Sequence, residues 1–206
     1  SPVRAQTPPA VQRSFALTRP VFSGERARDV VAFMDRYFRL PGNTGFDASI
    51  HHVEDILKLA GYVDESRAKP ADRLTYRIEH RPRGTPAWDV EDASVTIVGE
   101  REPLLRYPTN KNMLAINSFS TPDTGVVAEV VDVGRGAATD YDQASVAGKI
   151  VLGSGGAGRV FSEAVQRRGA IGVFSYGLPG FNQAESHPRS IQFTSIAFDS
   201  TKKSWG

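Results

Sequence analysis

The stretch KIVLGSGGAGRVFSEAVQRRGAIGVFSY (149–176) decides how the second half of this chain folds. It begins with an apolar run that is typical of a buried strand and continues into a glycine-rich turn. An amphipathic helix and a second apolar strand follow. Within the turn, Gly153, Gly155 and Gly158 form the pattern G-x-G-x-x-G. This pattern occurs in dinucleotide-binding loops, but three glycines can also serve a purely structural turn.

A dinucleotide site requires an acidic residue about 20 positions further along, where it binds the ribose hydroxyls. Here the second strand ends in Ser175, Tyr176 and Gly177, with neither an acid nor an arginine. We therefore interpret the glycines as a strand-to-helix turn in which backbone segments approach closely and side chains would clash. A nucleotide-binding enzyme that uses the 153–158 loop is kept as the weakest hypothesis.

Composition excludes several classes of protein. The chain has 206 residues, of which 40% are hydrophobic and 23% charged, as in an ordinary folded protein. It contains no cysteine, which excludes disulfides, cysteine-ligated zinc, iron–sulfur clusters and thiol nucleophiles. The net charge of +2, without a basic run interleaved with aromatic residues, predicts no nucleic-acid partner. No apolar run approaches the ~20 residues that span a bilayer, so no membrane span is expected.

Residue patterns divide the first part of the chain. Residues 1–21 are rich in proline and are expected to be an extended or disordered arm. Residues 22–62 have helical periodicity and are predicted to form a helical hairpin, with Ser23 as an N-cap and Gly61 as the stop. Its helices are expected over about 23–38 and 47–60. Its apolar stripe from Ala27 to Phe38 is expected to pack on another domain.

Strand-like alternation follows the hairpin. Residues 63–124 are predicted to be a β-rich connector, with strands over 74–81 and 94–102. Residues 125–206 form the last predicted domain, with further strands at 125–134 and 191–198. The predicted fold class is α+β, in which the helical hairpin precedes a β-rich domain.

This last domain resembles the protease-associated (PA) domain over about residues 125–200. The residues that carry the resemblance are the GKIVL strand (148–152), the glycine loop with an arginine (153–159), the helix (161–168) and Gly169-Ala170-Ile171-Gly172, which leads into an apolar strand. The preceding VDVGRG (131–136) and Asp140-Tyr141 are similar to the entry strand of that family. The resemblance implies a small β-barrel or sandwich with flanking helices.

The order of hairpin, β structure, SFSTP linker (118–122) and PA-like domain resembles the N-terminal region of exported zinc aminopeptidases of the M28 type. SIHHVEDILKLAGYV (49–63) and KNMLAINSFSTPDTGVVAEVVDVG (111–134) are similar to that region in general character. In that family the catalytic domain follows the PA domain. The resemblance implies that this chain ends before the catalytic domain, with its PA-like domain cut short at the C-terminal end.

The residues with catalytic or metal-binding chemistry do not form a recognisable set. The M28 pattern needs an H-x-D pair and an adjacent Glu-Glu pair. None of the four histidines, His51, His52, His80 and His187, begins an H-x-D pair, and the sequence contains no Glu-Glu pair. In HHVED (51–55), His51 and Asp55 are spaced to share one metal on a helix face, but a solvated face is the favoured interpretation. Ser154 lacks the G-x-S-x-G context of a nucleophile elbow. We expect Trp88 and Trp205 to pack or form interfaces, and Asp140, Tyr141 and Asp142 to lie in a solvated acidic loop.

The sequence therefore predicts no catalytic, cofactor-binding or metal-ligating residue in this chain, and whether it acts as an enzyme is left open. The leading hypothesis is the non-catalytic N-terminal and PA-domain portion of a secreted M28-like zinc aminopeptidase. It would shape substrate access or mediate protein contacts, and zinc is expected only in the absent catalytic domain. The alternative is a free-standing PA-like module that binds a peptide or protein. Expected partners are a peptide, a protein or the missing catalytic domain. The expected location is secreted or periplasmic, after removal of a signal peptide.

Overall fold

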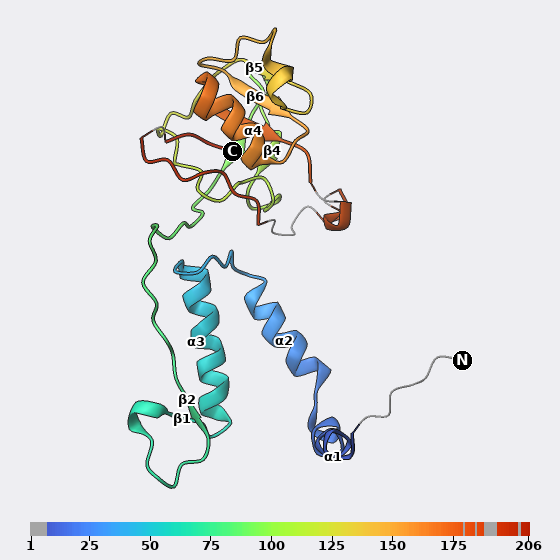
Figure 1. Cartoon of the computed structure of the whole chain (residues 1–206), viewed down its shortest axis with the longest axis vertical. Coiled ribbons are helices and arrows are strands. Elements are labelled where there is room, and N and C mark those ends of the chain that lie inside the picture. The colour runs from blue at the N-terminus through green and yellow to red at the C-terminus, as the bar shows by residue number, and fades with distance from the viewer. Residues whose placement is uncertain (1–7, 179, 184, 188–192, 202) are drawn as a thin grey trace, which may run out of the picture. The chain divides into compact units, whose positions relative to one another are not determined.

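The computed structural model describes residues 8–178, 180–183, 185–187, 193–201 and 203–206 (Figure 1). The chain divides into two compact units, Ser1–Asp89 and Val90–Gly206. Both units contain helices and short strands, so the architecture is mixed helix and sheet and is compatible with the predicted α+β class. The boundary between the units falls inside the segment 63–124 that we predicted as a connector.

The first unit begins with a helix that the sequence analysis missed. Helix α1 (Pro9–Thr18) occupies part of the expected extended arm, with Pro9 in its first turn, and a 3-10 turn (Arg19–Val21) follows it. A proline is well tolerated at this position because its missing N–H has no helical partner there. Every residue of α1 is exposed, so local propensity forms this helix without a buried face. Residues 1–7 of the predicted arm lie outside the described residues.

The two helices predicted for the hairpin are present as α2 (Gly24–Met34) and α3 (Thr44–Leu59), and α2 ends four residues before its predicted end at 38. The Ser23 side chain accepts a hydrogen bond from the Arg26 amide at 3.2 Å, as expected of an N-cap. Gly61 follows the end of α3 with a φ of +87°, which a residue without a side chain adopts readily. The two helices touch where the Phe33 ring stacks on His52, with centroids 3.8 Å apart.

Helix α3 begins three residues earlier than predicted. The Asn43 side chain caps it by accepting from the Phe46 amide at 2.9 Å, and also donates to the Phe38 carbonyl at 3.0 Å. A side chain at Gly45 would collide with that same carbonyl, so only glycine allows the turn to lie so close to α3. The LPGNTG segment (40–45) therefore contains the start of α3.

The two strands predicted over 74–81 and 94–102 are much shorter in the structure. Strand β2 (Thr75–Tyr76) pairs in parallel with β1 (Val63–Asp64), which a 3-10 turn (Glu65–Arg67) follows. Strand β3 (Ser94–Val95) pairs antiparallel with β4 (Leu105–Arg106). After β3, the Glu100 amide donates to the Ile97 carbonyl at 3.0 Å and Gly99 has a φ of +98°, so a turn ends the extended segment.

The prediction for 74–81 failed for a different reason. The alternating residues beyond β2 bury no face against a sheet, and Arg77 and Arg81 instead form ion pairs with Glu79 at 2.6 and 2.7 Å. These three side chains are two residues apart, so they lie on one side of an extended backbone. The alternation therefore reflects an exposed charged ladder, not a half-buried strand.

The second unit is organised around a parallel sheet of order β5-β6-β7. Its strands are β5 (Val130–Asp132), β6 (Ile150–Gly153) and β7 (Gly172–Ser175). A 3-10 turn (Ala138–Tyr141) lies between β5 and β6, and helix α4 (Ala157–Phe161) with a π-helical segment (Ser162–Gln166) connects β6 to β7. The strand, turn, helix and strand predicted from 149–176 are confirmed.

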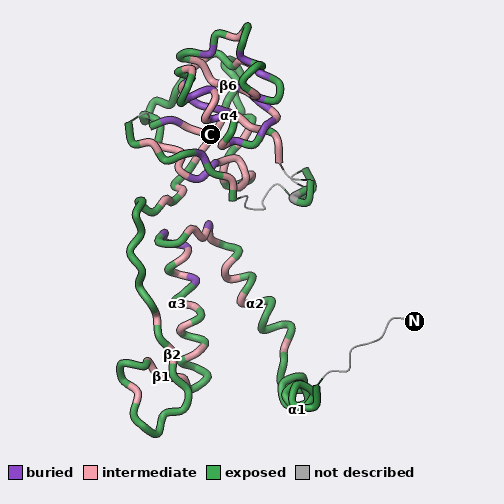
Figure 2. Tube along the Cα trace, in the orientation of Figure 1, coloured by how far each residue is buried: buried purple, intermediate pink, exposed green. Residues whose placement is uncertain are grey.

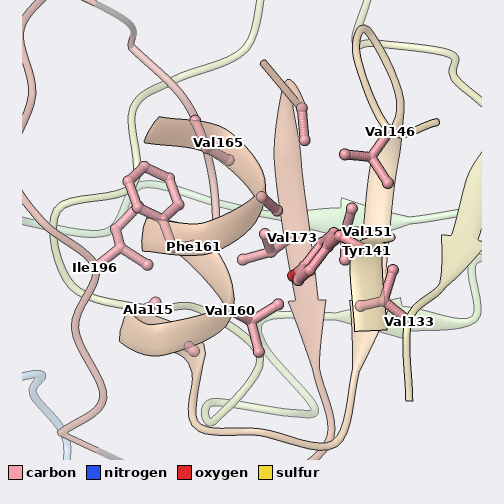
Figure 3. Close-up of a cluster of buried hydrophobic side chains, with 13 residues drawn as sticks. Ala115, Val133, Tyr141, Val146, Val151, Val160, Phe161, Val165, Val173 and Ile196 are labelled. Carbon is pink, nitrogen blue, oxygen red and sulfur yellow. The ribbon is translucent and has the colours of Figure 1, made fainter. Parts of the chain in front are cut away.

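The buried core of this unit lies between α4 and the sheet. Phe161, Val160 and Val165 from the helical segment meet Val151 and Val173 from the central and edge strands, and all five are almost completely buried (Figure 3). Figure 2 shows buried residues of this unit both on these elements and on the segments around them. The alternate burial of β6 is typical of a strand that packs one face against a helix.

The predicted strands at the two ends of the PA-like region are also shortened. Only Val130–Asp132 is a strand within 125–134, because Gly125, with a φ of +72°, donates to the Pro122 carbonyl and closes a turn. Within 193–198, Ser195 forms a single parallel bridge with Ile116, and the Ile196 amide donates to the Ile116 carbonyl at 3.0 Å. Residues 191–192 of the predicted strand lie outside the described residues. A further 3-10 turn spans Gly180–Asn182.

None of the helices in the described ranges combines the length and the apolar composition that a bilayer crossing requires.

Candidate functional site

A cavity of about 410 Å³ opens at the carboxyl ends of β5 and β6. The loop after β5 and the glycine turn after β6 supply its walls. The lining residues are Arg135, Ala137, Ser154, Gly155, Gly156 and Arg159.

Hydrogen bonds between the two loops hold the cavity in shape. The Ser154 amide donates to the Gly134 carbonyl at 2.7 Å, and its hydroxyl donates to the same oxygen at 3.1 Å. The Gly134 amide in turn donates to the Asp132 carboxylate at 2.8 Å. The bonds between Ser154 and Gly134 extend the β5–β6 ladder beyond the strands, so the lining residues follow two paired strands of the sheet.

The glycine turn is built by close backbone approach, as we inferred from its sequence. A side chain on Gly155 would collide with the Arg135 carbonyl and would lie 2.8 Å from the Arg159 guanidinium. The Gly155 carbonyl accepts from the Ser175 hydroxyl at 2.6 Å, which ties the turn to the end of β7. Glycine is thus required at 155 by packing alone, without any ligand.

The cavity lining is cationic. Arg135 and Arg159 take part in no ion pair with the part of the chain that the structure describes, and the lining contains no acidic residue. Two carboxylates close to Arg135 in sequence accept hydrogen bonds from the backbone: Asp132 from the Gly134 amide at 2.8 Å and Asp140 from the Ala137 amide at 2.9 Å. Such an arrangement can bind an anion, but the Ser154 hydroxyl has no base among its contacts to make it a nucleophile.

The structure does not gather the histidine and acid cluster of 51–55 into a metal site. His51 Nδ1 lies 3.1 Å from Glu54, His52 stacks on Phe33, and Asp55 is an exposed residue near Lys58. His80 and His187 are exposed. In the described ranges no three residues among His, Asp and Glu lie close enough together to hold a metal ion.

The remaining candidates have structural surroundings. Trp88 packs edge-on against Phe38 with centroids 5.3 Å apart, and Trp205 packs on Gly172. Asp140 caps the loop at Ala137, while Asp142 is exposed. Tyr141 is buried in the core, against the expectation of a solvated loop, because its ring packs under Arg168, whose Cζ is 4.5 Å from the ring centroid.

Sequence reasoning missed the pair Arg135 and Arg159 as site residues. Each follows the end of a parallel strand by a few positions, and this shared placement was the available signal. The pairing of β5 with β6, which the sequence does not encode locally, is what brings the two arginines to one cavity.

In the first unit, a polar cluster around Glu54 joins helix α3 to strand β2. The Glu54 carboxylate is 2.8 Å from Lys58 Nζ, accepts from the Tyr76 hydroxyl at 2.7 Å and lies 3.1 Å from His51. The hydrogen bond from Lys58, then those from Tyr76 and His51, lower the pKa of Glu54 to about 2. The hydrogen bond that each makes to Glu54 raises the pKa of Lys58 and the pKa of Tyr76.

We expect the first unit to lose stability in acid because of Glu54. Its pKa in the folded chain, about 2, lies below the ordinary value of 4.5. Folding is therefore favoured by the ionised carboxylate above pH 4.5, and this contribution disappears as the pH falls from about 4.5 to about 2. Amide hydrogen exchange of α3, followed across this range, measures the effect. Glu54→Gln should be less stable at neutral pH and should lose the part of the acid dependence that Glu54 supplies, while Asp64 and Glu79, whose pKa values are also lowered, keep theirs.

Asp55→Asn is the matched control for this prediction, because Asp55 is the neighbouring acid on α3 and its side chain is 70% exposed. It should leave the acid dependence in place. An unchanged pH profile in Glu54→Gln would show that other carboxylates govern the acid response of α3.

No protein-family model matches the chain, and comparisons with curated proteins and with solved structures find no match.

Proposed function

We propose that this chain is the non-catalytic N-terminal and PA-like portion of a secreted or periplasmic M28-type zinc aminopeptidase. In this proposal the second unit shapes access of a peptide substrate or contacts a partner protein. The zinc ligands belong to a separate catalytic domain. The short open sheets seen here would be completed into a small barrel or sandwich by further strands.

One observation supports this proposal most. The segments that resemble the PA domain are consecutive in sequence, and they are also the segments that pack together: β6, the glycine turn, α4 and β7 enclose one core. Val151 of β6, Phe161 of α4 and Val173 of β7 are 0%, 1% and 2% exposed. A chance likeness of short motifs would not require its parts to form a single packed unit.

Exposed apolar residues of the hairpin are consistent with a missing neighbour. Val31 on α2 is 64% exposed, and Ile56 on α3 is 38% exposed. Exposed apolar surface of this kind is often covered in a complete assembly. Under this proposal, the exposed part of the stripe from Ala27 to Phe38 packs on the catalytic domain, whereas Phe38 itself is already buried against Trp88.

The proposal predicts that the purified chain neither hydrolyses peptide bonds nor binds stoichiometric zinc. Chromogenic aminoacyl anilides with added zinc measure the first property, and equilibrium dialysis followed by metal analysis measures the second. A chelator-treated sample controls for a contaminating peptidase. Hydrolysis that purifies with the chain, or one zinc ion per chain, would contradict the proposal.

The intact mass of the native gene product tests the proposed context directly. We expect a mass well above the 22.4 kDa of this chain, with the H-x-D and Glu-Glu pairs in the additional sequence. A native mass of 22.4 kDa would instead favour the alternative function, a free-standing PA-like module that binds a peptide or protein. The cavity at the ends of β5 and β6 is the observation that favours this alternative.

A further inference from the structure

We propose that the cavity at the ends of β5 and β6 is a binding site for the carboxylate of a peptide, held by Arg135 and Arg159. This inference depends only on the cavity and its lining. It is therefore independent of the proposal that the chain is part of an aminopeptidase.

The first argument is the charge of the lining. Two guanidinium groups border one hollow of about 410 Å³, and no carboxylate borders it. Arginines on protein surfaces commonly meet acids, as Arg167 and Arg168 do with Glu163 at 2.7 and 2.6 Å in the same unit. The residues outside the described ranges include neither Asp nor Glu, so no acidic side chain among them can neutralise the two arginines.

The second argument is that the cavity has a defined shape. Its size falls within the range of small-ligand pockets, about 300–1,000 Å³. Both walls are fixed to paired strands: Ser154 is bonded to Gly134 by its amide and by its hydroxyl. Gly155 is fixed to Ser175 on β7. A ligand would therefore meet a backbone frame that is already in place, which lowers the entropic cost of binding.

The third argument selects the kind of anion. A pyrophosphate held by a glycine-rich loop lies directly against the loop backbone. Here the Arg159 guanidinium lies beside the turn, because its Nη2 atom is 2.8 Å from the position that a Cβ atom of Gly155 would take. An anion in the cavity would therefore meet guanidinium N–H groups next to the loop. A planar carboxylate matches the fork of an arginine through two parallel hydrogen bonds.

The absence of an acid at the end of β7 also argues against a nucleotide. The ribose of a dinucleotide needs a carboxylate there, whereas this strand ends in Ser175, whose hydroxyl already donates to Gly155. A peptide carboxylate needs no such partner.

The test is a titration of the full chain, observed through the amide resonances of Gly155, Gly156 and Ala137 in ¹H–¹⁵N spectra at low salt. The probes are N-acetyl-Ala-Ala with a free carboxylate, the same dipeptide as its amide, inorganic phosphate, NAD and sodium chloride. We expect saturable shifts with the free carboxylate, with a Kd on the order of 1 mM because the guanidinium groups are exposed to water.

Variants then identify the residues responsible. Arg135→Gln and Arg159→Gln should each weaken binding at least about tenfold, since each removes a charged hydrogen-bond donor. Arg101→Gln is the matched control, an exposed arginine in the same unit that does not line the cavity, and should bind normally. Arg159→Lys keeps the charge but loses the fork, and it should also bind more weakly. An unchanged spectrum elsewhere shows that each variant is folded.

Four outcomes would overturn the inference. They are no saturable shift with the carboxylate peptide, equal binding of its amide, tighter binding of phosphate or NAD, and a loss of binding in Arg101→Gln as large as in the cavity variants. The peptidase and zinc measurements above are separate, so failure of this site and failure of the proposed function can be distinguished.

Discussion

Phe161→Ala is expected to lower the free energy of unfolding of the second unit by about 3–5 kcal/mol. Phe161 is 1% exposed and is the largest of the fully buried side chains, so its removal opens a cavity between α4 and the sheet. Small domains have a total stability of about 5–15 kcal/mol. The variant should therefore be close to unfolding at room temperature.

Trp205 fluorescence provides the measurement, in urea titrations of a Trp88→Phe background. Trp88 belongs to the first unit and Trp205 to the second, so this background reports on the second unit alone. The matched control is Phe181→Ala, which removes the same side chain from a position that is 84% exposed. It should change the unfolding free energy by no more than about 0.5 kcal/mol. Similar losses in the two variants would mean that the core does not lie where we describe it.

Gly155→Ala is the second change with a large expected effect. A methyl group at this position would overlap the Arg135 carbonyl, and it would press on the Arg159 guanidinium and on Val160. Overpacking costs about 1–3 kcal/mol. We expect a loss at the upper end of this range, because the Arg135 carbonyl is part of the backbone and the loop after β5 must move away from the turn after β6. Urea unfolding in the absence of any ligand measures the loss.

The adjacent glycine is the control for this prediction. A side chain on Gly156 would meet no atom within 4 Å, and its φ of −60° suits any residue. Gly156→Ala should change stability by less than about 1 kcal/mol, because the loss of a favourable N-cap residue is offset by lower entropy of the unfolded chain. Equal effects of the two substitutions would contradict the view that Gly155 serves a structural turn.

Local sequence signals predicted the elements whose formation depends on neighbouring residues. The capping serine before α2 and the glycine after α3 were identified correctly, since a cap and a left-handed turn need only the adjacent backbone. The order of β6, α4 and β7 was predicted because an apolar run, a glycine turn and an amphipathic period follow one another without interruption. Helix α1 was not predicted, because a proline-rich stretch is typical of an extended arm. Pro8 and Pro9, however, lie at the N-cap and at the first position of the helix, where proline is compatible with a helix.

Local sequence signals could not predict the lengths of the strands or the position of the candidate site. Alternation over 74–81 describes either a half-buried strand or an exposed charged ladder, and only the presence or absence of a pairing strand separates the two. Burial of Tyr141 beneath Arg168 likewise depends on residues far apart in the sequence. His51 and Ser154 have side chains suited to metal binding and to nucleophilic attack. In the structure, however, His51 bonds to Glu54, and the Ser154 hydroxyl donates to the Gly134 carbonyl.

The order of residues alone predicts the helices of the hairpin and the strand–turn–helix–strand unit of 149–176, because these features rest on contacts between near neighbours in the chain. The need for glycine at 155 depends instead on the Arg135 carbonyl, twenty positions earlier, so it is a tertiary feature. Only the tertiary structure decided which short segments pair, that Val160 and Phe161 face Val151 and Val173, and that Arg135 and Arg159 border one cavity. The two arginines border one cavity because of the parallel pairing of β5 with β6. It joins residues about twenty positions apart, and no local propensity encodes that distance.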